Sequence, residues 1–352
     1  MTHLEIAQQR LYNQCISGPK FKKPAEIVTC MGAIQAQDYA GAKWAVGLRL
    51  QKSSDEAIDK AMANGSIIRT HVLRPTWHFV SPADARWMIE LTAPRINAAS
   101  ASRHRHFKLD SAVFKRSNDA LAKALEGGRQ LNRIKVLNEL NNAGVATDDL
   151  RFIHLLMRAE LDKVICSGGR QGKQFTYALF DDRVPTGNTL SKEEALAELA
   201  KRYFMSHGPA TIQDFTWWSG LSGIDARKGF EIVKSELTSI KVDSNEYWTV
   251  PGKADVRGKT PIAHLLPAFD EFAVAYKDRT AAVNPKYLKE APHVIFNPSI
   301  VVNSQVVGTW QRSIHKNAID IALNPFGKLN KVQEKAVGVA AERFRKFLDP
   351  GK

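Results

Sequence analysis

The stretch Asp55–Val80, DEAIDKAMANGSIIRTHVLRPTWHFV, decides the fold because its apolar pattern changes from helical to extended within a few residues. Its first part, Asp55–Ala63, is predicted to be a helix, since apolar side chains recur there at intervals of three and four residues. These side chains are Ala57, Ile58, Ala61 and Met62. Ser53 or Ser54 is suited to cap the helix at its N-terminus, and Gly65 ends it.

Two strand-like runs follow this helix. Ile67–Ile68 and Thr76–Val80 are rich in β-branched and aromatic residues, and His71–Pro75 joins them. Further helices are predicted upstream, at Leu4–Gln14, at Ala25–Ile34 and after Gly41. A group of helices that ends in a β-hairpin is typical of a winged-helix unit, in which a helix enters the major groove and the hairpin contacts phosphates or the minor groove. We assign residues 1–82 to such a unit.

The same order of elements recurs twice along the chain. Residues 83–183 contain predicted helices at Asp84–Ala101, Ser111–Leu125, Arg133–Asn141 and Asp149–Leu161, then strands at Lys163–Cys166 and Gln174–Leu179. Residues 184–260 contain helices at Lys192–Met205, Ile212–Trp218 and Ala226–Ser235, then strands at Ser239–Val242 and Tyr247–Val250. Residues 261–352 carry strand-like runs and a closing helix, at Ile262–Leu266, His293–Phe296, Ser299–Val302, Gln305–Trp310 and Lys331–Phe347. The predicted fold is α+β and mainly helical, with three tandem winged-helix units and a C-terminal β-rich segment.

The composition indicates a DNA-binding protein. Fifty Lys and Arg residues against 36 Asp and Glu residues give a net charge of +14, and such an excess attracts phosphates regardless of base sequence. No apolar run approaches the roughly 18 residues that a membrane span needs, and the N-terminus lacks a signal-peptide pattern. The cysteines, Cys15, Cys30 and Cys166, are too few and too widely spaced for a disulfide framework. We therefore expect a cytoplasmic protein, associated with the nucleoid in a bacterium.

Two of the three predicted hairpins are basic at the tip. The first carries Arg69 and Arg74 and the second Arg170 and Lys173, whereas the third has an acidic turn. We expect the first two to make most of the DNA contacts. The turn Ser167–Lys173 is similar to a phosphate-binding loop, but it joins two strands and lacks the first Gly and the Ser or Thr of that motif. A hairpin tip that holds DNA phosphates is the better interpretation.

The run Arg103–His106 combines two arginines with two histidines. Imidazoles two residues apart on a helix point in different directions, and no other ligand motif accompanies them. We predict an exposed basic helix end in which Arg103 and Arg105 contact phosphates. No metal and no cofactor is expected.

Aromatic and acidic pairs have competing explanations. Trp217 and Trp218 lie in a helix full of apolar neighbours and are predicted to be core residues, although indoles also stack on bases. Asp270 and Glu271 are adjacent acids that either serve as a general base or orient a water, or else form a structural ion-pair corner. The sequence leaves the role of this acidic pair open.

The stretch Gly32–Ala45 contains two glutamines, Gln35 and Gln37, separated by one small residue just after a predicted helix. At such a turn, side chains two residues apart can enter one cleft. Each amide offers two donors and an acceptor, which suffice to hold a water or a sugar oxygen. Glutamine is also common at helix ends, so the pattern alone decides nothing.

Four stretches together resemble the AlkZ/YcaQ-like family of winged-helix DNA glycosylases. They are Gly32–Ala45, Arg69–Val80, Leu265–Arg279 and Val301–Ser313, in the order in which the family has them. The resemblance implies three tandem winged-helix units and a β-rich C-terminal part around a concave, DNA-sized channel. It also implies a monofunctional glycosylase that hydrolyses the N-glycosidic bond of alkylated purines, including N7-alkylguanine, with interstrand crosslinks as further substrates of some members.

The family's Gln-x-Gln motif falls on Gln35, Ala36 and Gln37, which favours the AlkZ-like branch. Ala36 is smaller than the Leu or Val that is usual there. The resemblance implies that the two glutamines hold the attacking water and the deoxyribose, with Asp38 as an electrostatic helper. An N7-alkylguanine is already cationic and leaves without a strong general acid, so orientation and charge stabilisation suffice.

The expected DNA contacts are mostly cationic side chains. They are Arg69, Arg74, His78, Arg103, Arg105, Arg170, Lys173, Arg279 and Arg312. Arg74 and His78 are expected at the lesion-bearing backbone or the minor groove. The expected partner is double-stranded DNA, bound by a monomer. The alternative is a non-catalytic winged-helix regulator, which would prefer one sequence, usually a palindrome, and bind it as a dimer.

Overall fold

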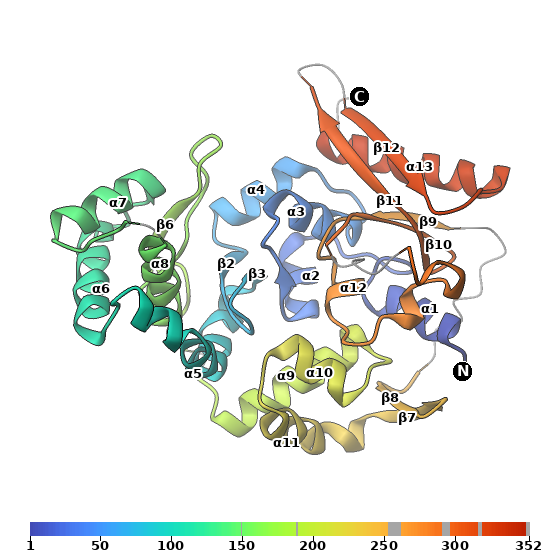
Figure 1. The fold of residues 1–352 in the computed structure, drawn as a ribbon, viewed down its shortest axis with the longest axis horizontal. Helices are drawn as coiled ribbons and strands as arrows, with labels where there is room; N and C mark the ends of the chain where they lie inside the picture. The colour runs from blue at the N-terminus through green and yellow to red at the C-terminus, as the bar shows by residue number, and fades with distance from the viewer. Residues whose placement is uncertain (149, 188, 253–261, 291–295, 316–318, 350–352) are drawn as a thin grey trace.

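The structure is a computed structural model, which describes residues 1–148, 150–187, 189–252, 262–290, 296–315 and 319–349. It is a mixed α/β fold, mainly helical, with several small sheets, as predicted. In Figure 1 the first group of helices lies at the centre and the second group lies at one end. The third group lies below them, and the C-terminal sheet with its helix lies at the opposite end. No helix in the described ranges is long and apolar enough to cross a membrane.

The first group covers residues 1–80. Its helices are α1 (His3–Asn13), α2 (Pro24–Met31), α3 (Tyr39–Leu48) and α4 (Asp55–Ala63), and its strands are β1 (Ile34–Gln35), β2 (Ile68–His71) and β3 (Trp77–Val80). The predicted helix Asp55–Ala63 is confirmed, and Ser54 caps it by accepting a hydrogen bond from the backbone N–H of Ala57. Ile34 was predicted to end a helix and instead begins a strand, because Gly32 at φ +76° ends α2 two residues earlier.

The second group covers residues 82–183. Its helices are α5 (Pro82–His106), α6 (Ser111–Leu125), α7 (Arg133–Asn142) and α8 (Arg151–Leu161), and its strands are β4 (Leu131–Asn132), β5 (Ile165–Ser167) and β6 (Thr176–Leu179). The three strands form a sheet of order β4-β6-β5. The first group has the same arrangement, with its strands in the order β1-β3-β2. In both groups a short strand from between the helices is added to the closing hairpin, and neither of these added strands was predicted.

The third group and the C-terminal segment complete the chain. The third group has helices α9 (Lys192–His207), α10 (Ile212–Ser219) and α11 (Gly223–Val233), the short helix η1 (Lys234–Glu236), and the hairpin β7 (Thr238–Val242) and β8 (Asn245–Thr249). The C-terminal segment has β9 (Ala263–Leu266), α12 (Glu271–Val274), η2 (Thr280–Ala282), η3 (Pro285–Tyr287), β10 (Ser299–Val302), β11 (Gln305–Ile314), β12 (Ile319–Pro325) and α13 (Lys331–Leu348). Its antiparallel sheet has the order β12-β11-β10-β9. The predicted strand His293–Phe296 lies almost entirely outside the described residues.

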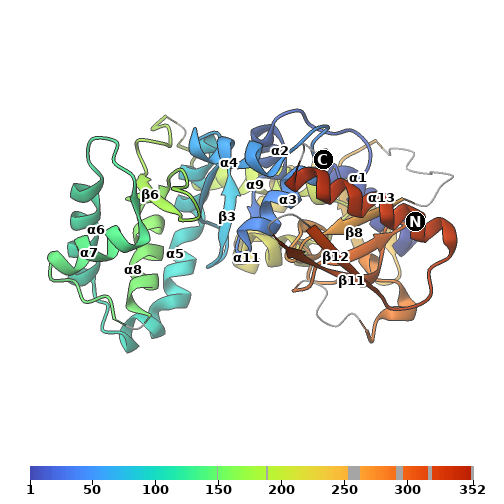
Figure 2. The ribbon, with the colours of Figure 1, turned by 90° about the horizontal axis from the view of Figure 1, so that it is seen from above.

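Hydrophobic cores connect segments that are distant in sequence. One core joins the first group to the C-terminal sheet and α13, including Trp44, Trp310 and Phe344. A second core joins the strands of the first group to α5 and to the third group. The second group has a smaller core of its own, and Figure 2 shows this group at one end of the long axis. The first group is therefore enclosed by its neighbours, whereas most of the second group stands apart.

Candidate functional site

The Gln-x-Gln stretch lies at the edge of the central sheet of the first group. Gln35 is the second residue of β1, which pairs with β3 so that Ile34 faces Phe79 and Gln35 faces His78 across the strands. Side chains alternate between the faces of a sheet, and directly opposed residues share a face. Ile34 and Phe79 accordingly enter the hydrophobic core that the first group shares with the C-terminal segment. The side chains of Gln35 and His78 point to the other face.

Three hydrogen bonds from three directions fix the backbone of the motif. The N–H of Ala36 donates to the carbonyl oxygen of Trp77 at 2.7 Å, which extends the pairing with β3. The carbonyl oxygen of Ala36 accepts from Nε of Arg69 on β2 at 3.1 Å. The N–H of Gln35 donates to Oε1 of Glu271 on α12 at 2.8 Å. The motif therefore stands on a rigid support that combines two strands with the C-terminal segment.

Glu271 connects this support to the third group. Its side chain is fully buried, and its Oε2 accepts from the indole N–H of Trp218 on α10 at 3.0 Å and lies 3.5 Å from Nε2 of His207 on α9. Burial raises the pKa of Glu271, but the contacts with His207 and with the N–H of Gln35 outweigh it and leave the pKa below its ordinary value. The carboxylate thus stays ionised and accepts hydrogen bonds on both oxygens.

Asp270, beside Glu271, resolves the open question about the acidic pair. Its two oxygens each lie 2.9 Å from a terminal nitrogen of Arg49, and both side chains are buried. It also caps α12 by accepting from the backbone N–H of Phe272. Asp270 is therefore a structural ion-pair corner, and Glu271 supports the glutamine motif.

One face of the central sheet carries a row of buried polar side chains. Gln35 on β1 pairs with His78 on β3, and His78 pairs with Thr70 on β2, so all three side chains share that face. Gln35 is 8% exposed, and the other two are fully buried. Among the described residues, no hydrogen-bond partner exists for Oε1 of Gln35, Nε2 of His78 or Oγ1 of Thr70. Buried polar atoms are nearly always paired, and those left unpaired mark a strained site or a place for water or ligand.

Arginine side chains border this row. Arg74, from the turn between β2 and β3, is half-buried and has an unpaired Nη2, as has Arg279 after α12. Burial lowers the pKa of both guanidinium groups, and the Glu271 carboxylate partly offsets this for Arg74. Arg279 lies over the ring of Trp217, with 5.5 Å from its guanidinium carbon to the ring centroid. Two partly desolvated cations are thus available to an anion.

The other two motif residues lie nearer the surface. Gln37 is exposed, in the connection that follows β1. Asp38 caps α3, because its Oδ1 accepts from the backbone N–H of Gly41 at 3.1 Å. The expected electrostatic role of Asp38 gains no support from this arrangement, since the carboxylate is used as a helix cap.

Arg69 was expected to contact DNA, but its side chain is buried. It pairs with Phe79 across the strands, which puts it on the opposite face from His78. Its guanidinium is buried among the rings of Tyr39, Trp77 and Phe175, at 5.9, 4.4 and 4.9 Å from their centroids. Arg69 is therefore a positioning residue for the Ala36 carbonyl, because the alternation of β2 turns it away from the polar row.

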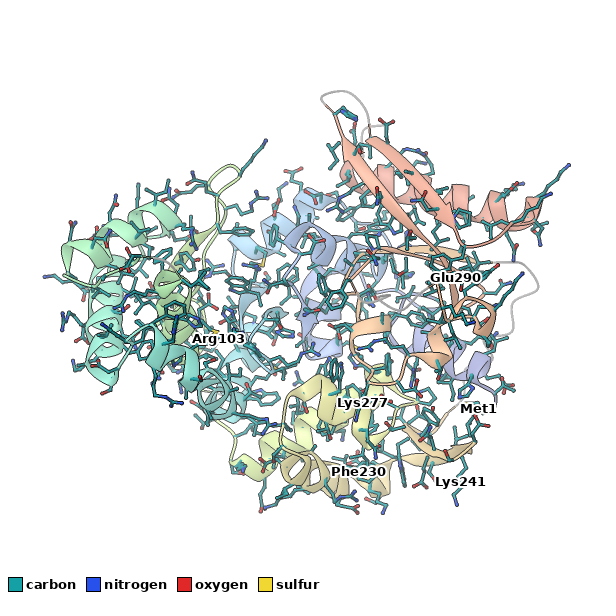
Figure 3. All side chains as sticks on the ribbon, in the orientation of Figure 1. Met1, Arg103, Phe230, Lys241, Lys277 and Glu290 are labelled. Carbon is teal, nitrogen blue, oxygen red and sulfur yellow. The ribbon has the colours of Figure 1, made fainter. Side chains whose placement is uncertain are left out.

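The remaining predicted cations do not gather in one place. Arg103, Arg105 and Lys173 are exposed, and Figure 3 labels Arg103 on the second group. Arg170 is half-buried, with its Nη1 3.7 Å from a carboxylate oxygen of Asp59. Arg312 on β11 is half-buried over the ring of Phe344. These residues are spread over the second group and the C-terminal sheet.

Sequence reasoning missed three members of the site. Glu271 was considered only as one of an acidic pair, and Thr70 was not singled out. Trp218 was correctly predicted to be core, and its indole N–H also donates to Glu271. The same prediction was wrong for Trp217, which is 43% exposed. Among the described residues no group of His, Cys, Asp and Glu is arranged to hold a metal ion.

Comparisons with known proteins agree with this architecture. The profile of the AlkZ-like DNA glycosylase family matches residues 28–347. A curated protein of Streptomyces sahachiroi, described as an interstrand DNA cross-link repair glycosylase, is 23% identical over 358 residues, which covers 95% of this chain and 93% of the relative. The solved structure of the DNA glycosylase AlkZ from Streptomyces sahachiroi superimposes with a TM-score of 0.80 at 22% identity, over 99% of this chain and 96% of that one.

The family match covers nearly the whole chain and includes every element of the site: the Gln-x-Gln strand, the central sheet, Trp218 and Glu271. The chain belongs to the AlkZ-like family and is a DNA glycosylase.

Proposed function

We propose that this glycosylase hydrolyses the N-glycosidic bond of N7-alkylguanine in double-stranded DNA, and that Gln35 and Gln37 hold the attacking water and the deoxyribose. The observation that carries the proposal is the side-chain oxygen of Gln35. It is buried, it has no partner among the described residues, and its strand is fixed by the hydrogen bonds of Gln35 and Ala36. Such an acceptor is ready to hold a water or a sugar hydroxyl hydrogen without further rearrangement.

The chemistry of an N7-alkylguanine suits a site built from neutral amides. The base already carries a positive charge, so it accepts the electrons of the breaking bond without being protonated. The protein has only to orient water at C1′ and to favour the developing positive charge on the sugar. Amide oxygens present partial negative charge toward that sugar, and Gln35 directs one from a buried position.

Interstrand crosslinks are proposed as further substrates. The support is the printed description of the Streptomyces sahachiroi relative, which matches nearly the full length of this chain. Gln37 is exposed and the motif lies at the edge of a sheet. A lesion at such an edge needs less space around it than one that must enter an enclosed pocket.

The protein is proposed to bind duplex DNA as a cytoplasmic monomer. The net charge of +14 supports attraction to phosphates. The proposed phosphate contacts lie on the second group, beside the motif and on the C-terminal sheet; they are Arg74, Arg103, Arg105, Arg170, Lys173, Arg279 and Arg312. The cysteines are free, which suits a reducing compartment.

Release of 7-methylguanine from a methylated duplex tests the proposal. We expect the wild-type protein to release the base and to leave alkali-labile abasic sites. The double variant Gln35→Ala with Gln37→Ala is expected to lose the release by about 100-fold or more while it binds DNA as before. Gln213→Ala, an exposed glutamine on α10, is the matched control. Full activity in the double variant would overturn the assignment of the site, and no release by the wild type would overturn the substrate.

A further inference from the structure

We propose that His78 is a catalytic residue of this glycosylase, and that its Nε2 accepts a proton from the water that attacks C1′ of the damaged nucleotide. The inference rests on the proposed function and deepens it. The sequence predicted His78 to contact the lesion-bearing backbone or the minor groove. Its position, its protonation state and its unpaired nitrogen together assign it a different task.

The position of His78 places it beside the glutamine motif. Gln35 and His78 are directly opposed residues of antiparallel strands, so their side chains leave the same face of the sheet as neighbours. Opposed side chains in such a pair have Cβ atoms about 5 Å apart. A single water is therefore within reach of both the amide oxygen of Gln35 and the ring of His78.

A hydrogen bond fixes which ring nitrogen carries the proton. Nδ1 of His78 lies 2.9 Å from the backbone carbonyl oxygen of Thr76. A carbonyl oxygen only accepts hydrogen bonds, so Nδ1 must be the protonated nitrogen. In a neutral imidazole the second nitrogen then has a free lone pair. Nε2 of His78 is thus a hydrogen-bond acceptor and not a donor.

Nε2 has no hydrogen-bond partner among the described residues, although the side chain is fully buried. A buried acceptor that stays unpaired is destabilising, so a water or a ligand group is expected to satisfy it. The adjacent members of the row, Gln35 and Thr70, each have an unpaired buried oxygen as well. Two of the three unpaired atoms are pure acceptors and the hydroxyl of Thr70 both donates and accepts, which fits a bound water with two protons to donate.

The surroundings keep the ring neutral. Burial lowers the pKa of His78 well below 6.5, and the charge of Arg74 and the nearby ring of His71 lower it further. The hydrogen bond with the Thr76 carbonyl raises the pKa but does not outweigh these effects. The basic nitrogen is therefore present near neutral pH. A base of low pKa is sufficient here, because an oxocarbenium-like sugar is a strong electrophile and asks little of its nucleophile.

The step is balanced as a hydrolysis. The C1′–N9 bond breaks and its electron pair leaves with the base, so the cationic N7-alkylguanine departs as a neutral molecule. The oxygen of water forms the new bond to C1′ and passes one proton to Nε2 of His78. The imidazolium then returns this proton to solvent. Gln35 orients the water and undergoes no covalent change.

A pair of substitutions separates this role from a structural one. His78→Asn retains a donor for the Thr76 carbonyl but removes the acceptor at the position of Nε2, whereas His78→Gln places an amide oxygen near that position. We expect the single-turnover release of 7-methylguanine to fall about 100-fold in both variants, because neither amide accepts a proton at neutral pH, with unchanged Kd for the duplex. His3→Asn, near the N-terminus, is the control. A histidine that only supports the Thr76 carbonyl would be replaced by asparagine with little loss of release, and one that only holds the water would be replaced by glutamine. Either result would overturn the inference.

A second measurement needs no variant. Nitrogen NMR of the histidine-labelled wild-type protein at neutral pH is expected to show Nδ1 of His78 protonated and Nε2 unprotonated. A protonated Nε2 would overturn the inference even if both variants failed to fold. Activity of Gln35→Ala, measured in parallel, keeps the two proposals apart. If Gln35→Ala is inactive while both His78 variants are fully active, only the proposed role of His78 is wrong. If the wild-type protein is inactive, the proposed function itself is wrong.

Discussion

The first hairpin (β2, β3 and residues 72–76) and the second hairpin (β5, β6 and residues 168–175) have similar basic sequences but opposite placements. In the first hairpin, Arg69 is buried beneath aromatic rings and His78 faces a buried polar row. In the second hairpin the turn is exposed at Lys173 and neighbouring residues. The comparison shows that positive charge in a hairpin does not define a DNA contact. What packs against the hairpin decides whether a cation remains exposed or supports the site.

Neighbouring elements enclose the first hairpin on several sides. Glu160 on α8 accepts from the backbone N–H of His71 at 2.9 Å and lies 2.5 Å from Nδ1 of its ring. Gly220, which ends α10 at φ +66°, lies so close that an added Cβ would come within 2.2 Å of the carbonyl oxygen of Leu73. The second hairpin projects from a group with its own small core, as Figure 1 shows. The first hairpin is thus enclosed by its neighbours, whereas the turn of the second hairpin is exposed around Lys173.

The largest effect on the central region is expected from Glu271→Gln. Both carboxylate oxygens face N–H donors, from Gln35 and from Trp218, so the amide of the variant must direct its NH₂ at one of them. A buried unsatisfied donor costs about 1–3 kcal/mol, and β1 loses an anchor. We expect a lower Tm and a loss of base release of about 100-fold, with unchanged DNA affinity. Activity within twofold of wild type would show that the anchor is dispensable.

Arg69→Met is expected to have the next largest effect and sharpens the comparison most. The variant fills the space among the rings but removes the hydrogen bond to the Ala36 carbonyl, so the motif is held less firmly. We expect about a tenfold lower single-turnover rate, with the same Kd and the same dependence of Kd on salt. A weaker salt dependence would mean that Arg69 contacts phosphate after all, since each phosphate contact contributes a slope of about 0.9.

Lys173→Ala in the second hairpin is expected to give the opposite result. The side chain is exposed, so its removal leaves stability and the rate of bond cleavage unchanged. The Kd for duplex DNA is expected to rise about threefold, and the salt slope to decrease by about 0.9 if one phosphate contact is lost. Lys335→Ala on α13 provides an exposed lysine as a control. An unchanged Kd and slope would remove the second hairpin from the DNA interface.

The smallest effect concerns pH and the buried histidine of the first hairpin. The pKa of His78 is lowered by burial, so below about pH 6.5 the unfolded chain binds a proton that the folded protein excludes. Stability from this group is complete above that pH and decreases as pH falls, by about 1.4 kcal/mol per unit. Between pH 7 and pH 5.5, the free energy of unfolding should therefore decrease by about 1 kcal/mol more in the wild type than in His78→Gln, as measured by thermal unfolding. Equal losses would contradict the buried neutral ring.

Local sequence patterns predicted most helices and both basic hairpins. The bounds of α4 and α6 were predicted to the residue, because a capping side chain and an amphipathic face mark each helix. β1 was missed because two residues are too few to show the alternation of a strand. In addition, only Gly32 marks the end of the preceding helix, so the apolar pattern seemed to continue to Ile34. Short strands like this one are defined by the partner strand and not by their own sequence.

The candidate site was only partly predictable for the same reason. The Gln-x-Gln pattern and the family resemblance identified Gln35, but nothing local indicated that Glu271 would hold its backbone across more than 200 positions of sequence. The burial of Arg69 likewise depends on Phe175, which the second hairpin supplies. Long-range contacts of this kind follow from tertiary packing and leave no mark in a short stretch.

Single-turnover release of 7-methylguanine by Gln35→Leu, measured with enzyme in excess beside the Kd for the same duplex, tests the central claim most directly. Leucine retains much of the volume of glutamine and removes the buried amide oxygen. The account predicts a rate about 100-fold or more below wild type with an unchanged Kd. A rate within twofold of wild type at equal Kd would contradict it.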